Sequence, residues 1–289
     1  MPKLAVGVPC FNEAPYIEDC LRSISENNLD GVQIYIEDNN STDGSLTKIE
    51  AFLDSLPKTK MRHFNLHKRT KTVSAGENFK RPLSVTNTPY FMWIGAHDML
   101  TDNFFESCFD SFKANPNASM VSGKPLALSS DSTELKDLGV TYDFKSGDPL
   151  TRYLKSAKEL GDCTIMHSIF KRDATQEFDW PRIGSADHIL ISNILWHGSL
   201  IYCNKAGYMR RYFDNDNRQA KADAGHYLND KNKVLFFSEY MKNFAACIDG
   251  QYPVEIEGYV HNLLFNTLCQ RFGLPNTLKT ASNPLLDVA

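Results

Sequence analysis

A histidine and an aspartate that directly follow a short apolar run form the most chemically suggestive pattern in this sequence. The run Phe91–Ile94 predicts a buried strand, Gly95 ends it, and His97 and Asp98 come next. An imidazole and a carboxylate at the carboxyl end of a strand can hold a cation or move a proton, and open α/β sheets bind their ligands at that edge. A solvated loop is the alternative interpretation.

A second polar cluster follows another predicted strand, Val32–Ile36. Its last part, Ser41–Ser45, is explained by a turn and a helix N-cap, because Ser, Thr, Asp and Asn all serve there. That interpretation does not account for Glu37 and Asp38, which come directly after the strand. A carboxylate at this place can accept a hydrogen bond from a base N–H or a ribose hydroxyl, so both carboxylates are candidates for a binding site.

The elements that would position these residues alternate between strands and helices. Apolar runs predict strands at residues 4–8, 32–36, 61–66 and 91–94, with helical periodicity at 15–27, 46–56 and 72–83. Pro9 is expected to end the first strand. Parallel strands need a crossover element, so two strand–helix units in the first 56 residues indicate a parallel sheet. The chain is more turn-rich after Thr101, and helical periodicity returns at 233–248 and 255–271.

Composition excludes several classes of protein. The 289 residues are 42% hydrophobic, enough for a packed core, and the net charge of −4 gives no basic field, so we expect no nucleic-acid partner. The seven scattered cysteines lack C-x-x-C spacing and indicate reduced thiols and a cytoplasmic protein. The N-terminus enters a strand without a signal peptide, and no apolar run is long enough for a transmembrane segment.

The segments Val8–Glu13 and Ile36–Ser45 together resemble the opening of family 2 glycosyltransferases, which carry V-P-x-Y-N-E and then D-D-x-S-x-D-x-[ST]. The resemblance is sharp over about residues 4–105. It implies the GT-A fold, a Rossmann-like α/β fold of nucleotide-diphospho-sugar transferases with a mixed, mostly parallel sheet flanked by helices. We expect this domain at residues 1–215, with a nucleotide-sugar-binding half at 1–100 and an acceptor-binding half at 101–215. A C-terminal helical extension would occupy residues 216–289.

The resemblance also assigns roles to individual residues. It implies that Asp38 binds the base, most often uracil, and that Arg210 or Arg211 pairs with the diphosphate. The full set of nucleotide-binding residues implied in this way is Pro9, Asn12, Glu13, Asp38, Gly76, Asn78, Arg210 and Arg211.

The metal motif of the family departs from its usual form in this chain. Gly95-Ala96-His97 stands where D-x-D is expected, which leaves Asp98 as the remaining carboxylate. We expect His97 and Asp98 to be the metal ligands. Imidazole favours manganese over magnesium, since magnesium prefers all-oxygen sites. A weakened, metal-independent or inactive site is the alternative.

The catalytic base implied by the resemblance is Asp187. Members of the family start a helix here with an acidic residue, often a Glu-Asp pair, and Ala186 replaces the first of the two. Asp187 would accept the proton of the acceptor hydroxyl as its oxygen attacks the anomeric carbon. The alternative is that Ser185 and Asp187 only cap the helix.

The expected reaction is therefore an inverting transfer of a hexosyl or N-acetylhexosaminyl group. The donor would be a nucleoside-diphosphate sugar, most often UDP-linked. The acceptor would be a saccharide or lipid-linked hydroxyl, in polysaccharide or glycolipid synthesis at the inner face of a membrane. A catalytically silent nucleotide-sugar-binding protein and a sugar nucleotidyltransferase are the alternatives, although the loop 9–13 lacks the glycine and basic residues of the latter.

We expect the C-terminal helices to pack on the main domain, with homo-oligomerisation or membrane contact as the alternatives.

Overall fold

The computed structural model describes residues 2–129, 135–139, 141–175, 186–213 and 230–271, without the side chains of 230–236. The chain forms two compact units. The first comprises Met1–Thr141, Thr164–Gln176 and Leu200–Asn215, and the second comprises Tyr142–Cys163, Glu177–Ser199 and Asp216–Ala289. The domain boundary expected between residues 215 and 216 stays a prediction.

A mixed sheet forms the centre of the first unit. Over the described residues it has nine strands, in the order β3-β2-β1-β4-β8-β6-β9-β5 with β7 beside β6. The strands are β1 (Leu4–Cys10), β2 (Val32–Asp38), β3 (Phe64–Lys68), β4 (Tyr90–Trp93), β5 (Met99–Leu100), β6 (Ala118–Ser129), β7 (Leu135–Asp137), β8 (Ile169–Lys171) and β9 (Ser199–Tyr212). Strands β3, β2, β1 and β4 are parallel, and β8 pairs antiparallel to β4. The predicted mixed α/β sheet is confirmed.

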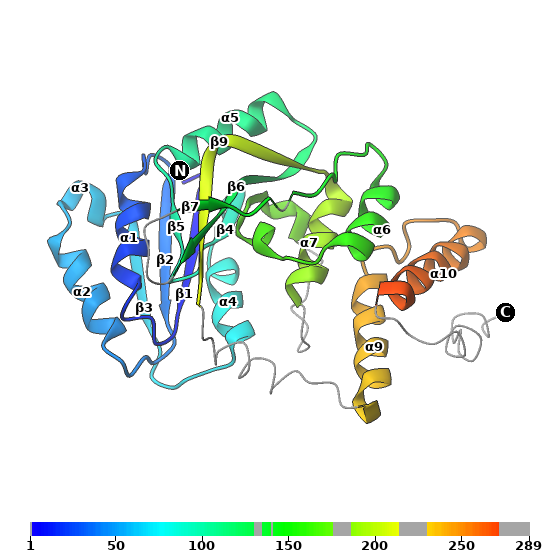
Figure 1. Ribbon diagram of the computed structural model, residues 1–289, viewed down its shortest axis with the longest axis horizontal. Coiled ribbons are helices and arrows are strands. Elements are labelled where there is room, and N and C mark those ends of the chain that lie inside the picture. The colour runs from blue at the N-terminus through cyan, green and yellow to red at the C-terminus, as the bar shows by residue number, and fades with distance from the viewer. Residues whose placement is uncertain (1, 130–134, 140, 176–185, 214–229, 272–289) are drawn as a thin grey trace. The chain divides into compact units, whose positions relative to one another are not determined.

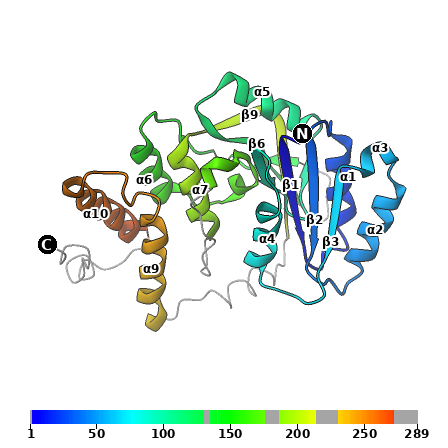
Figure 2. The same cartoon turned by 180° about the vertical axis from the view of Figure 1, so that it is seen from behind.

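Helices cover both faces of the parallel strands, with α1 and α2 on one face and α4 on the other (Figures 1 and 2). The helices of this unit are α1 (Ile17–Glu26), α2 (Ser45–Ser55), α3 (Lys58–Met61), α4 (Ala75–Ser84) and α5 (Phe104–Ala114), with the short 3-10 turns η1 (Thr164–His167) and η2 (Arg172–Thr175). Helix α4 begins at its N-cap Ser74, whose side chain accepts a hydrogen bond from the Glu77 amide.

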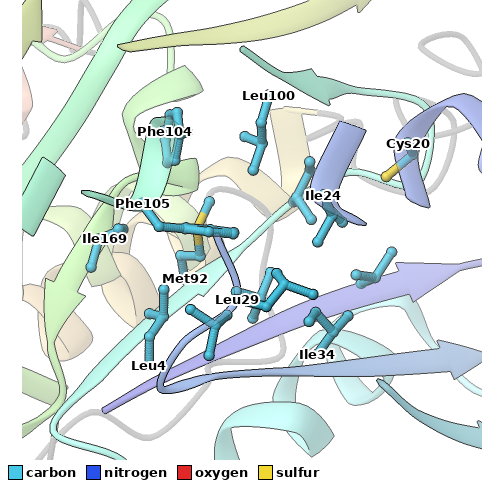
Figure 3. Close-up of a cluster of buried hydrophobic side chains, with 14 of the residues drawn as sticks. Leu4, Cys20, Ile24, Leu29, Ile34, Met92, Leu100, Phe104, Phe105 and Ile169 are labelled. Atoms are coloured by element: carbon cyan, nitrogen blue, oxygen red, sulfur yellow. The ribbon is translucent and has the colours of Figure 1, made fainter. Parts of the chain in front are cut away.

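The largest apolar cluster lies between α1, α5 and the sheet (Figure 3). Cys20 and Ile24 on α1 pack into the same cluster as Ile34 on β2, Met92 on β4 and Phe105 on α5. All five side chains are almost completely buried. This packing fixes the parallel strands, so their carboxyl ends lie side by side at one edge.

Strand β1 is longer than the sequence predicts. It continues through Pro9 to Cys10, although we expected Pro9 to end it. The Gly7 carbonyl accepts the Ile94 amide, so the polar groups of Gly7 face β4. The backbone of Pro9, two residues further on, faces the same side, where the β4 pairing has ended at Trp93. The missing N–H of proline therefore breaks no ladder bond.

The third predicted strand is displaced along the chain. Residues 58–61 form the helical turn α3, and the strand β3 begins only at Phe64. Its parallel pairing with β2 runs from Ile34 opposite Phe64 to Asp38 opposite Lys68. Strand β2 correspondingly extends beyond its predicted end at Ile36, so Glu37 and Asp38 are the last strand residues.

The described helices of the second unit are α6 (Pro149–Glu159), α7 (Ala186–His197), α9 (Asp230–Ala245) and α10 (Val254–Arg271). A cluster that includes Tyr153, Ile189, Phe244 and Leu264 joins the four helices. Helices α9 and α10 therefore pack against α6 and α7, while the expected oligomer interface stays a prediction. Within the described residues, no helix is long and apolar enough to span a membrane.

A buried histidine lies in this helical core. His188 Nε2 is 3.1 Å from the Ser156 carbonyl, and its Nδ1 contacts the Tyr240 hydroxyl. If Nε2 donates to the carbonyl, Nδ1 accepts from Tyr240, and the ring is neutral. Burial, helped by the charge of Arg271, lowers the pKa of His188 to about 3. His188 is thus part of the helical core.

Candidate active site

Hydrogen bonds tie together the loops that leave β1 and β2. The Asn12 amide donates to Ser41 Oγ at 3.0 Å, and Asn12 Oδ1 accepts the Thr42 amide at 2.9 Å. The Glu13 amide donates to Ser45 Oγ at 2.7 Å. Asn12 has φ 57°, a left-handed conformation that asparagine tolerates better than most residues. Residues 41–45, for which the sequence predicts a helix cap, hold the β1 loop in place, while the N-cap of α2 itself is Gly44, without a side-chain cap.

Asp38 lies at the end of β2 and is 1% exposed. Its Oδ2 accepts the Ser41 amide at 3.2 Å, whereas its Oδ1 is buried and has no hydrogen-bonding partner among the described residues. A buried carboxylate oxygen without a donor is costly, and such exceptions indicate a missing ligand or water. Cys10 lies beside it, and burial, together with the charges of Asp38 and Glu13, raises the pKa of the Cys10 thiol to about 12.

The neighbouring carboxylate, Glu37, is also 1% exposed but is fully engaged. It accepts from His67 Nδ1 at 2.9 Å and pairs with the Arg81 guanidinium. This neutralisation leaves Asp38 as the better candidate for binding a base. The sequence alone does not distinguish the two carboxylates, because the partners of Glu37 come from β3 and α4.

Asn78 and Gly76 belong to the first half of α4. Asn78 Nδ2 donates to the Glu37 carbonyl at 3.2 Å, and Asn78 Oδ1 accepts from Arg69 Nε at 3.1 Å. Asn78 is 3% exposed, so its side chain positions the end of β2 and the Arg69 guanidinium. Gly76 lies in the first turn, two residues earlier. Arg69, directly after β3, is a cation that was not predicted as a site residue from the sequence.

Asp98 is buried, with an exposed fraction of 2%. Its Oδ2 accepts from the Tyr208 hydroxyl at 2.5 Å, and its Oδ1 accepts the Arg211 amide at 2.8 Å. Burial, together with the Asp98 charge, raises the pKa of Tyr208, so the tyrosine remains a donor. Tyr208 also stacks on His167, with ring centroids 4.8 Å apart. Tyr208 and His167 were not predicted from the sequence, because they meet Asp98 only through β9 and η1.

His97 is more accessible than Asp98, with 29% of its side chain exposed. Its Nδ1 is 3.1 Å from Glu13 Oε1, and its Nε2 is 3.8 Å from Asp98 Oδ1. The predicted metal ligands thus lie together, and they also meet the predicted nucleotide-binding residue Glu13. Pro9 is buried one residue before the end of β1.

The packing around residue 95 explains why a glycine, and not a carboxylate, occupies this position. A Cβ atom at residue 95 would lie 2.5 Å from Asp98 Oδ2 and 3.5 Å from His97 Nε2. The Asp98 carboxylate therefore occupies the space into which a side chain at 95 would project. Any larger residue at 95 would have to displace Asp98 from its bonds with Tyr208 and Arg211.

The two predicted arginines project from opposite faces of β9, as successive strand residues do. Arg211 donates from Nε to the His97 carbonyl at 3.0 Å, and its guanidinium lies 4.8 Å from the Tyr16 ring centroid. Arg210 donates from Nη1 to Thr164 Oγ1 at 2.6 Å. Arg211 therefore supports the His97 loop, while Arg210 lies on the η1 side of the strand.

Asp187 lies in the first turn of α7, in the second unit, and is half-buried. Its Oδ1 accepts the His188 amide at 2.9 Å, an interaction that suits an acidic residue at a helix start. Burial, followed by the Asp187 charge and a hydrogen bond with it, raises the pKa of the Cys163 thiol. Ser185 lies outside the described residues, and the role of Asp187 as general base stays a prediction.

Solved structures with a similar fold include a mannosyltransferase and complexes with a nucleotide or nucleotide sugar. S. aureus TarS 1-349 in complex with UDP-GlcNAc aligns with a TM-score of 0.67 and 14% identity over 99% of this chain and 76% of that chain. The UDP complex of the same fragment gives a TM-score of 0.64 and 14% identity over 95% and 73%. The mannosyltransferase PcManGT from Pyrobaculum calidifontis, in complex with GDP-Man and Mn2+, gives 0.54 and 14% over 99% and 77%. These likenesses establish the GT-A fold.

The family follows from the sequence match. A family model described as glycosyl transferase family 2 matches residues 5–178, which is more than half of the chain. The chain belongs to glycosyl transferase family 2, as the motifs at residues 8–13 and 36–45 predicted. A search of curated proteins found no match.

The residues around His97 fit a divalent cation. His97 Nε2 faces Asp98 Oδ1 and could share a cation with it, whereas Glu13 lies at the other ring nitrogen, Nδ1. Each Asp98 oxygen accepts one hydrogen bond, and a carboxylate oxygen has a further lone pair for a metal. A mixed set of nitrogen and oxygen ligands suits manganese better than magnesium.

Proposed function

We propose that this chain transfers a sugar from a UDP-linked donor to an acceptor hydroxyl, with inversion at the anomeric carbon. The observation that carries the proposal is the buried, unpartnered Oδ1 of Asp38 at the carboxyl edge of the parallel strands. A base N–H is a donor of the kind that this oxygen lacks. The TarS complexes with UDP and UDP-GlcNAc support a uracil base and a hexosyl or N-acetylhexosaminyl donor.

The remaining donor contacts would come from the edge that Asp38 shares with the β1 and β3 loops. Asn12 and Glu13 are held against the β2 loop, and Pro9 lies beside Glu37 in the sheet register. Arg69 would supply positive charge near the base and ribose, positioned by Asn78. Because these groups are already ordered by their mutual hydrogen bonds, donor binding would cost little reorganisation.

His97 and Asp98 would hold a divalent cation that contacts the diphosphate. Such a cation supplies positive charge that stabilises the leaving nucleoside diphosphate. Arg211 holds the carbonyl of His97, and Tyr208 holds the carboxylate of Asp98, so both ligands are preorganised. Manganese is favoured by the imidazole ligand, and the PcManGT complex with Mn2+ supports it.

Asp187 would act as general base on the acceptor hydroxyl. The half-buried carboxylate at the start of α7 can take a proton, and direct attack by the acceptor oxygen gives inversion. We propose a saccharide or lipid-linked acceptor, as in polysaccharide or glycolipid synthesis.

The burial of Asp98 favours a second candidate function, a nucleotide-sugar-binding protein without transferase activity. The two candidates differ in turnover. Calorimetry with nucleoside diphosphates and their sugar conjugates, with and without Mn2+, should show the tightest binding for a UDP-sugar. Donor hydrolysis or transfer to an added saccharide acceptor should then release UDP.

Two results would contradict the proposal. Equal affinity for UDP, GDP, CDP and TDP would remove the assigned role of Asp38 in base recognition. Tight UDP-sugar binding without UDP release, over a panel of saccharide and lipid-linked acceptors, would favour the silent binding protein.

A further inference from the structure

Three potential metal ligands meet where α9 turns into α10, in the second unit. They are Asp249 in the turn, and Glu257 and His261 on α10. Each offers one ligand atom, and the three atoms lie within 4.8 Å of one another. Glu257 and His261 are four residues apart, so they share one face of the helix.

The imidazole of His261 gives an independent indication of a missing ligand. Its side chain is 11% exposed, and its Nε2 is buried and without a hydrogen-bonding partner among the described residues. Asp249 Oδ1 is only 2.8 Å from Nε2, yet no hydrogen bond forms. A short distance alone does not make a hydrogen bond, which also requires the N–H to be aligned with the oxygen.

The backbone around the turn holds the three side chains in place. The Asp249 amide donates to the Ala245 carbonyl at 3.0 Å, which continues the hydrogen bonding of α9. Gly250 follows with φ 70°, a conformation that favours glycine, and its amide donates to Glu257 Oε1 at 2.5 Å. The turn therefore presents Asp249 to the face of α10 that carries Glu257 and His261.

We propose that Asp249, Glu257 and His261 bind a zinc ion that ties the α9–α10 turn to α10. Two carboxylates and an imidazole are zinc ligands, and a water molecule would complete four-coordination on the exposed side of Asp249. Calcium and magnesium prefer more oxygen ligands than this site offers. Ligand atoms of a tetrahedral zinc site lie about 3.3 Å apart, so binding would draw the most distant pair closer together.

The site is separate from the cation site proposed at His97, so its test removes that residue first. The background is the full chain with His97→Ala. In this background Glu257→Gln removes a charged ligand but keeps an oxygen for the Gly250 amide, and His261→Gln removes the imidazole. The control is His197→Ala, because His197 is an exposed histidine at the end of α7 in the same unit.

Equilibrium dialysis against Zn2+ should find one tightly bound ion in the background and in the His197→Ala control. Glu257→Gln and His261→Gln should each weaken it by on the order of 100-fold or more, since loss of outer-shell partners alone costs 10- to 100-fold. Zn2+ should also slow amide hydrogen exchange over residues 249–261 in the background but not in Glu257→Gln. Circular dichroism checks that each variant is folded, and Glu257→Gln decides the test if His261→Gln does not fold.

Two outcomes would overturn the proposal. One is an unchanged zinc affinity in a folded Glu257→Gln variant. The other is the absence of bound zinc in the background at about 10 μM free Zn2+.

Discussion

Replacing Asp38 by Asn should weaken UDP binding without destabilising the protein. The asparagine can keep an oxygen toward the Ser41 amide, which now donates to Asp38 Oδ2. Its amide group would then occupy the place of Oδ1, the buried oxygen that has no partner. The substitution thus presents a donor where the proposed base N–H needs an acceptor.

The expected size follows from the net strength of a hydrogen bond to a charged group. Such a bond is worth about 1.5–3 kcal/mol, which corresponds to about a 10- to 150-fold loss of UDP affinity. The free energy of unfolding should stay constant or rise by up to about 1–3 kcal/mol, because burying a neutral amide group costs less than burying a carboxylate. Lower affinity with equal or higher stability is the signature of a residue kept for binding.

Asp43 is the matched control in the same loop. Its Oδ1 accepts from the Ser45 amide and its Oδ2 from the Ala14 amide, both at 2.9 Å. Asp43→Asn should lower the free energy of unfolding by about 1 kcal/mol, because an asparagine has one oxygen and can keep only one of these two hydrogen bonds. It should change UDP affinity less than Asp38→Asn does.

Urea denaturation and calorimetry with UDP measure both quantities. If Asp38→Asn bound UDP as tightly as the wild type, Asp38 Oδ1 would not face the base. If the variant were strongly destabilised, the oxygen would have a structural partner, and its interpretation as an empty ligand position would be wrong.

Three further predictions concern catalysis, the cation and pH. Asp187→Asn should abolish transfer while calorimetry shows nearly unchanged donor binding, and normal turnover would refute the assignment of the base. His97→Ala should remove the enhancement of UDP binding by Mn2+, and an enhancement that persists would place the cation elsewhere. His188 has a lowered folded-state pKa, so its contribution to stability is complete above its unfolded pKa of about 6.5 and is lost as the pH falls toward about 3. Between neutral pH and pH 5, the free energy of unfolding of the wild type, measured by urea denaturation, should fall by about 2 kcal/mol more than that of His188→Gln. Parallel pH profiles of the two proteins would contradict a neutral, buried ring.

Local sequence patterns predicted the helices and strands of the first 100 residues well. The spacing of Ile17, Cys20, Leu21 and Ile24 predicted α1, and all four side chains are buried. The pattern was less reliable where local preferences and tertiary pairing disagree. Pro9 lies within β1 because the neighbouring strand ends before it, a fact that no local rule contains.

The candidate site was predicted in part. Asp38, His97 and Asp98 were recognisable because polar residues after an apolar strand have no use in packing. The different surroundings of these three residues could not be predicted, since Tyr208 and Arg211 reach Asp98 from more than 100 residues away in the sequence. A short motif specifies which groups come to the sheet edge but not which of them are neutralised there.

The sequence by itself determined the family and the order of the elements, because hydrophobic periodicity and strand-end motifs are local properties of the chain. Only the tertiary structure decided which carboxylates remain available for a ligand. Glu37 is neutralised by His67 and Arg81, whereas Asp38 keeps a buried oxygen without a partner. The need for glycine at residue 95 likewise follows only from the fold, where the Asp98 carboxylate fills the space that a side chain at 95 would occupy. The physical reason is that hydrogen bonding and burial depend on which distant segments pack together.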